Sequence, residues 1–161
     1  MPAFDWIARE HPALVHLPIA ASLILPFPLA RSLDRAGWIP AARLLAWAGF
    51  AGGLAAVLSG FLWARGMDFI APGAWTPARP GLIATHEWLA VSGLGIGLAV
   101  LILVELNRIR TGLALALIWA TLWGAAGHWG GKMVFPEPEA ISQNILSAEP
   151  PWAIWALPKS S

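Results

Sequence analysis

Two residue types that often carry redox or metal chemistry are absent from this 161-residue chain: cysteine and tyrosine. Without cysteine there is no disulfide, no iron–sulfur cluster, no thiolate ligand and no covalently attached c-type haem. Without tyrosine there is no tyrosyl chemistry. Metal or redox chemistry here would therefore depend on other side chains, of which histidine is the commonest ligand.

Charge is also scarce. Charged residues make up 12% of the chain and hydrophobic residues 58%, whereas soluble domains are about 25% charged. This balance predicts an integral membrane protein of one domain. The net charge is +1 and no basic patch indicates a nucleic-acid partner. No nucleophile–base pair, phosphate loop or catalytic carboxylate pair indicates an enzyme that acts by itself.

Four apolar stretches predict transmembrane helices over residues 13–30, 44–64, 82–104 and 111–131. Each is near the roughly 20 residues needed to cross the hydrocarbon core. Prolines 18, 26 and 28 interrupt the first stretch and should kink or break its far end. We therefore predict an all-α, four-helix membrane bundle of up-down-up-down topology in residues 1–135. The Pro-rich residues 136–161 are predicted to form an interfacial tail that contacts lipid or a partner subunit.

Basic residues predict the orientation. The two short loops that join spans one to two and three to four carry Arg31, Arg35, Arg43, Arg108 and Arg110. The opposite side carries as many, spread over longer segments: Arg9, Arg65, Arg79, Lys132 and Lys159. Because density in short loops decides orientation, we place the short loops in the cytoplasm. Both termini then face outward, into the periplasm if the membrane is a bacterial inner membrane.

Tryptophans and glycines suggest how the helices pack. Three tryptophans fall deep within the spans and are predicted to be packing residues: Trp47, Trp119 and Trp123. Three glycine pairs have small-xxx-small spacing: Gly49 with Gly53, Gly93 with Gly97, and Gly127 with Gly131. Such pairs favour close helix packing, and they would also make room for a flat macrocycle between helices.

All four histidines fall at the predicted outer end. His11 precedes the first span, His16 opens it, His86 opens the third span and His128 closes the fourth. The parity of four antiparallel helices predicts that they cluster at one membrane face. Ionisable side chains near the bilayer are costly and mark functional sites by default.

A b-type haem in a helical bundle needs two imidazoles from different helices, small residues beside the ring and cations for the propionates. Its predicted axial ligands are His16, His86 and His128, with His16 and His128 favoured. The cations would be Arg65, Arg79 and Lys132, and the small residues include Gly60, Gly127 and Gly130.

Other interpretations of the same residues remain open. The histidines could cap helices, form a polar cluster, relay protons or bind quinol. Glu87 could accept a hydrogen bond from a histidine or favour a helix start. Copper is an alternative metal, because Met67 and Met133 fall near the histidines and thioether with imidazole suits copper.

The segments HPALVHLPIA (11–20) and GHWGGKMV (127–134) resemble the DUF2231 family of predicted bacterial membrane proteins. That family shows an HP-x-x-VHFP-like start and a GH-x-GG-x-L-V-Y-like end, and the resemblance covers roughly residues 11–135. By motif position His11, His16 and His128 carry over, and His86 has a looser counterpart. The family often continues with a His-Gly segment where this chain reads PEPEA. Some members are joined to cytochrome c domains, so the resemblance implies electron transfer at the outer face.

Together these features predict a membrane electron-transfer subunit that holds haem b near the periplasmic face. It would pass electrons between a membrane donor or quinol and a periplasmic partner such as a cytochrome c, within a larger complex. One alternative is a cofactor-free assembly subunit of such a complex, and another is a copper-handling membrane protein.

Overall fold

A computed structural model describes residues 10–70 and 80–134, and every regular element in them is a helix. In chain order these are α2 (His11–Leu14), α3 (His16–Ile24), α4 (Pro26–Ser32), the 3-10 helix η1 (Ala36–Trp38), α5 (Ile39–Ile70), α6 (Pro80–Glu105) and α7 (Ile109–Val134). The predicted tail over residues 136–161 lies outside the described residues.

Four helical segments are long and apolar enough to cross a membrane, which confirms the prediction of an all-α protein with four membrane helices. They are His11–Ser32, Ala36–Leu62, Thr85–Glu105 and Ile109–Lys132. The helices begin earlier than the apolar stretches, because a helix continues through polar residues at its ends. One consequence is that His86 lies well inside α6, which starts at Pro80, rather than in its first turn.

The first span consists of three short helices in line. Val15 and Leu25 separate them, yet both residues keep right-handed helical backbone angles. Pro18 and Pro26 lack the backbone N–H that would bond to the carbonyl four residues earlier. The break before Pro26 agrees with the predicted interruption. Pro12 stands at the first turn of α2, where its missing donor costs nothing, so the span already starts at His11.

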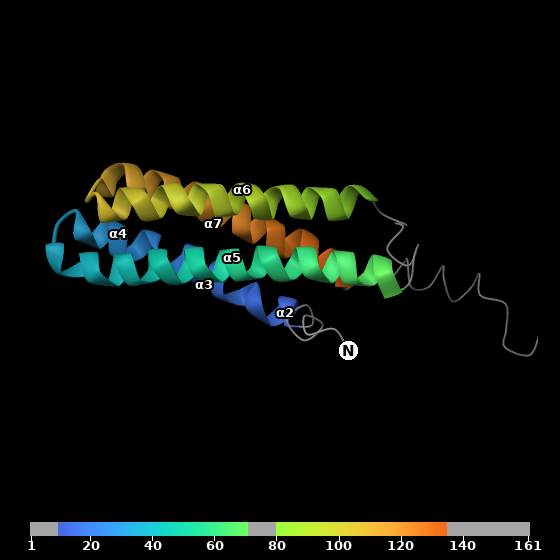
Figure 1. Ribbon diagram of the computed structural model, residues 1–161. Helices are drawn as coiled ribbons and strands as arrows, with labels where there is room; N and C mark the ends of the chain where they lie inside the picture. The colour runs from blue at the N-terminus through green and yellow to red at the C-terminus, as the bar shows by residue number, and fades with distance from the viewer. Residues whose placement is uncertain (1–9, 71–79, 135–161) are drawn as a thin grey trace, which may run out of the picture.

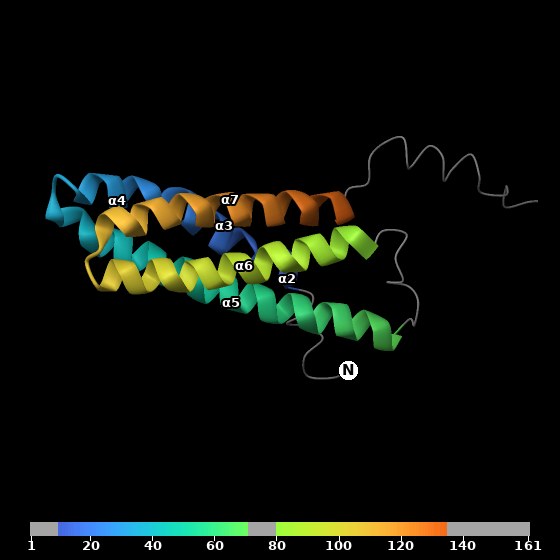
Figure 2. The same ribbon diagram turned by 90° about the horizontal axis from the view of Figure 1, so that it is seen from above.

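The helices pack as a ring around a common core. The connection from α4 to α5 and the tight turn from α6 to α7 lie at one end of the bundle, and the end of α5 and the start of α6 lie at the other (Figures 1 and 2). The first span packs against α5 and α7, and α6 packs against the same two helices. Within the described residues, the first span and α6 are therefore diagonal to each other.

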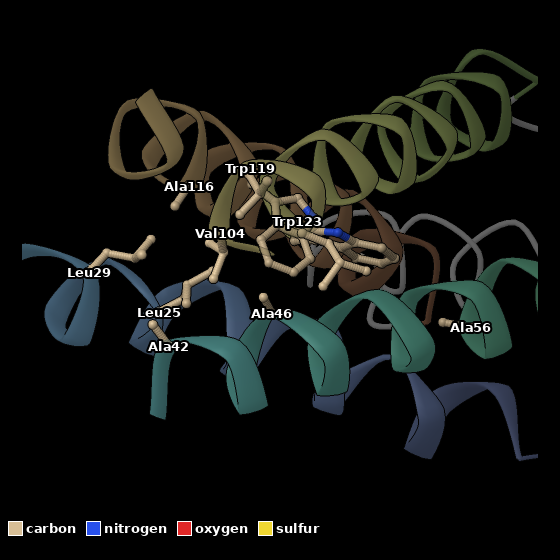
Figure 3. Close-up of a cluster of buried hydrophobic side chains, with 11 residues drawn as sticks. Leu25, Leu29, Ala42, Ala46, Ala56, Val104, Ala116, Trp119 and Trp123 are labelled. Carbon is tan, nitrogen blue, oxygen red and sulfur yellow. The ribbon is translucent and has the colours of Figure 1, made fainter. Parts of the chain in front are cut away.

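Trp119 of α7 fills the centre of the core (Figure 3). It is fully buried, and Trp123, one turn along the helix, is 3% exposed. Gly49 of α5 and Gly97 of α6 both lie against the Trp119 indole. A Cβ at Gly49 would lie 2.5 Å from Trp119 Cη2, and one at Gly97 would lie 2.7 Å from Trp119 Nε1.

Trp123 is held in the same manner by the next glycine on each helix. A Cβ at Gly53 would lie 2.9 Å from Trp123 Cζ2, and one at Gly93 would lie 3.1 Å from Trp123 Nε1. The glycine pairs of α5 and α6 thus receive two indoles from α7. That use differs from both sequence interpretations, which were direct helix contact and space for a macrocycle.

The remaining glycine pair and the third deep tryptophan have different surroundings. A Cβ at Gly127 would lie 2.9 Å from Ile19 Cδ1, so this glycine allows α7 to approach the first span. Among the described residues, nothing lies within 4 Å of a Cβ at Gly131. Burial of Trp119 and Trp123 confirms their predicted packing role. Trp47 is instead 54% exposed, and its indole Nε1–H donates to Glu105 Oε1 at 3.0 Å.

Candidate functional site

Two histidines from diagonal helices meet inside the bundle. The ring centres of His11, on α2, and His86, on α6, are 6.4 Å apart and the ring planes are nearly perpendicular, at 88°. Both residues are partly buried. Because their helices do not pack directly on each other, the two side chains reach toward each other across the bundle.

His11 is fixed by α5. Its Nδ1 lies 3.0 Å from the Ala56 carbonyl oxygen and 3.0 Å from Ser59 Oγ. Ser59 is fully buried, and its hydroxyl donates to the same carbonyl at 2.9 Å. A carbonyl oxygen only accepts, so Nδ1 of His11 carries the proton and donates. In the neutral ring the lone pair is then on Nε2.

His86 is fixed by α7 through an equivalent bond. Its Nδ1 lies 2.9 Å from the Ala126 carbonyl oxygen, which again assigns the proton to Nδ1 and the lone pair to Nε2. The acceptor is thus a backbone carbonyl, whereas the sequence suggested Glu87 as one possible acceptor. The two imidazoles tie the first span to α5 and α6 to α7.

Glycines make room for both rings. A Cβ at Gly60 would lie 2.9 Å from His11 Cε1, and one at Gly130 would lie 3.1 Å from His86 Cε1. Both glycines were predicted as small residues of a haem site. The structure shows that they accommodate the imidazoles themselves.

The other predicted ligands lie elsewhere. His16 and His128 are exposed, and the His128 ring lies edge-on to Trp129, with ring centres 6.1 Å apart. Lys132 Nζ lies 5.4 Å above the centre of the Trp129 ring. The side chains of Arg65, Arg79, Met67 and Met133 lie outside the described residues. Of the three predicted ligands, only His86 is brought to the pair, and its partner is His11.

The burial pattern of the first span contains the signal that identifies His11. Pro18, Ser22, Leu25 and Leu29 are buried, at the three- and four-residue spacing of one helix face. His11 lies seven residues, or about two helical turns, before Pro18 and therefore falls on the same face. His16 is only two residues from Pro18, about 200° around the helix, and so it points outward. This stripe includes the polar Ser22, whereas the apolar Leu17 and Leu23 are exposed, so the inward face of the span becomes visible only in the folded bundle.

The pair consists of the side-chain type that holds haem iron, and the distance between its ring centres can be compared with that of two imidazoles on one iron. An imidazole nitrogen lies about 1.2 Å from its ring centre and about 2 Å from a bound metal. Two imidazoles on opposite sides of one iron therefore have ring centres about 6.4 Å apart by the same estimate. Among the described residues, no three His, Cys, Asp or Glu side chains gather as a metal site. A haem iron needs only two protein ligands, and His11 and His86 are the two described residues that would hold it.

Comparison with known proteins gives no independent guide to this site. No protein-family model matches the chain, and no curated protein or solved structure is significantly similar to it. The functional argument therefore depends on the residues and their geometry.

Proposed function

We propose that the chain is a membrane electron-transfer subunit that holds a b-type haem between His11 and His86. The observation that carries the proposal is the imidazole pair itself. Each Nδ1–H donates to a backbone carbonyl, and the ring centres are 6.4 Å apart, across the diagonal of a four-helix bundle. A histidine ligand that donates its other N–H in this way is fixed in tautomer and orientation, and its basicity is raised.

In this proposal the chain positions the cofactor. His11 and His86 would hold the haem iron through their Nε2 atoms, and the carbonyl acceptors of Ala56 and Ala126 hold the rings in place. The haem, when bound, supplies one-electron transfer. Lys132, together with Arg65 and Arg79, belongs to the proposal as the source of positive charge for the propionates.

The proposed topology is up-down-up-down with both termini on the outer side of a bacterial inner membrane. The histidine pair then lies toward the periplasmic face. Electrons would pass between a membrane donor or quinol and a periplasmic cytochrome c, within a larger membrane complex. The resemblance of the two end motifs to the DUF2231 family is consistent with this placement and belongs to the same proposal.

The test is the haem content and reduced spectrum of the purified protein and four single variants. We expect His11→Ala and His86→Ala to lose the bis-histidine b-type spectrum. His16→Ala and His128→Ala are the matched controls and should retain it, because both side chains are exposed. Full haem in both His11→Ala and His86→Ala would contradict the assignment, and loss only in the two controls would restore the ligands favoured by the sequence.

Measuring the haem and copper content of the same purified protein also tests the two alternative functions. Copper bound at one equivalent, in protein that takes up no haem, would support the copper-handling alternative, since two imidazoles also suit copper. A chain that binds neither, yet co-purifies with membrane subunits, would be a cofactor-free assembly subunit.

A further inference from the structure

The end of the bundle opposite the histidine pair is rich in arginine. Arginines stand in the last turn of α4, between α4 and η1, near the start of α5, in the turn after α6 and at the start of α7. They are Arg31, Arg35, Arg43, Arg108 and Arg110. These helix ends lie together in Figure 1. Two carboxylates, Asp34 and Glu105, lie among them, so this end carries excess positive charge.

One of the five arginines is engaged within the protein. Arg43 Nε lies 3.5 Å from Glu105 Oε2, and its guanidinium also donates to Asn107 Oδ1 at 3.4 Å. The other oxygen of Glu105 accepts the indole N–H of Trp47. Glu105 is therefore already shared by two donors and is poorly placed to neutralise the other arginines.

The remaining four arginines present their guanidinium groups outward. They are Arg31, Arg35, Arg108 and Arg110, and all four are exposed. Within the described residues, no hydrogen bond or ion pair is found for these four side chains. The cations of this cluster are all arginines, which suit phosphate because a guanidinium binds phosphate oxygens through two parallel hydrogen bonds.

Aromatic side chains indicate the depth of this arginine layer. Trp47 is four residues deeper than Arg43 along α5, about 6 Å along the helix axis. It is 54% exposed on the outer surface of the bundle. Phe27 and Trp38 form an edge-to-face pair at the same end, with ring centres 5.3 Å apart. Tryptophan favours the boundary between headgroups and acyl chains, so the arginines lie at the level of the phosphates.

We propose that this arginine face binds the phosphate groups of anionic phospholipids. The occupant is a lipid rather than a soluble anion, because the exposed apolar surface beside Trp47, including Leu44 at 70% exposure, would contact the acyl chains of the same molecule. Each basic residue at an anionic surface favours association about fivefold. The proposal is independent of the haem, and either one can fail without the other.

The fluorescence of Trp47 can report which lipid lies beside the arginine face. The full chain would be reconstituted in phosphatidylcholine vesicles that contain a minority of phosphatidylglycerol, with brominated acyl chains on one lipid or the other. Subtracting the Trp47→Phe variant isolates the Trp47 fluorescence. We expect brominated phosphatidylglycerol to quench Trp47 about threefold more than brominated phosphatidylcholine at equal mole fraction, in keeping with the attraction of arginine to anionic lipid.

Two comparisons then test whether the four arginines cause the preference for phosphatidylglycerol. A chain with Arg31, Arg35, Arg108 and Arg110 all replaced by Gln should quench equally with both lipids, whereas Lys132→Gln, which removes a cation on the last turns of α7, should keep the preference. In the unaltered chain, raised salt should bring the ratio toward one. Equal quenching in the unaltered chain at low salt would overturn the proposal, as would a preference that survives either salt or loss of the four arginines.

Discussion

At the residue scale, the central feature is that a backbone carbonyl oxygen accepts a hydrogen bond from each of the two imidazoles. A carboxylate acceptor would bring negative charge into an apolar bundle, which is costly without a partner. The carbonyls of Ala56 and Ala126 hold the rings of His11 and His86 without that cost. Buried Ser59 adds a second oxygen beside His11 Nδ1. The arrangement fixes which ring nitrogen carries the lone pair.

Gly60 should be intolerant of even one added methyl group. In Gly60→Ala the new Cβ would lie 2.9 Å from His11 Cε1, so the ring must leave its position and lose its bonds to α5. We expect a loss of about 1–2 kcal/mol of stability, the net value of one or two hydrogen bonds. The measurement that shows the cause is the nitrogen NMR spectrum of His11, which should lose the single Nδ1–H tautomer.

Gly95→Ala is the matched control for this change. Among the described residues, a Cβ at Gly95 meets nothing within 4 Å, so the variant should keep the His11 tautomer and be at least as stable as the parent chain, because alanine favours a helix over glycine. An unchanged tautomer in Gly60→Ala would show that the ring is not confined by this glycine.

At the element scale, the core of the bundle contains two layers. Each layer consists of one indole from α7 and two glycines, one from α5 and one from α6. Trp119 and Trp123 lie one turn apart on α7, and each enters between a glycine of α5 and a glycine of α6. Within the part of the chain that the structure describes, their indole N–H groups have no hydrogen-bond partner. An unpaired buried donor costs about 1–3 kcal/mol. The shape of the indole, rather than its polar group, therefore accounts for its use here.

The contact between Gly49 and Trp119 predicts that one substitution can offset the destabilising effect of another. Gly49→Ala should destabilise the bundle by about 1–3 kcal/mol, because the added Cβ overlaps the far edge of the Trp119 ring and a packed core resists added volume. Trp119→Phe removes that edge, and it also removes an unpaired N–H. The double variant should therefore be more stable than additivity of the single variants predicts, as measured by unfolding in detergent. Strict additivity would mean that the two residues do not share one space.

The sequence predicts the helices far better than it predicts their rotation. Long apolar stretches determine four spans, and the interruption predicted at the far end of the first span corresponds to the break before Pro26, whereas the sequence does not predict the break at Val15. Which face of each helix points inward depends on the neighbours. On α7 the buried residues Trp119, Trp123 and Ala126 define a stripe, and His128 falls about 200° from Ala126 around the helix. The same reasoning separates His11 from His16, but the partner of each stripe becomes visible only in the assembled bundle.

The spacing of glycines also predicts a close contact without identifying the neighbour that makes it. Glycines four residues apart identify a place where something approaches the helix closely. At Gly49 and Gly53 that neighbour is a pair of side chains from α7, and at Gly127 it is Ile19 of the first span. Sequence spacing alone does not distinguish an indole from a helix or a cofactor, since each requires the same missing methyl group.

At the scale of the whole molecule, the two ends of the bundle differ in chemistry. One end carries the imidazole pair and its backbone acceptors, and the other carries exposed arginines and the Arg43–Glu105–Trp47 cluster. Basic residues near short loops are retained on the cytoplasmic side. The arginine end is therefore expected in the cytoplasm and the histidine end on the outside, where a periplasmic electron carrier would meet it.

The absence of cysteine makes this orientation directly measurable, since any single cysteine introduced would be the only thiol in the chain. Glu10→Cys reports on the histidine end and Gly37→Cys on the arginine end. Both positions are exposed, and a side chain at Gly37 meets nothing within 4 Å. In intact cells a membrane-impermeant maleimide should label Glu10→Cys, and it should label Gly37→Cys only after the membrane is disrupted. The reverse pattern would place the histidine pair toward the cytoplasm. An electron acceptor in the periplasm would then be untenable, although the imidazole pair and its haem assignment would still stand.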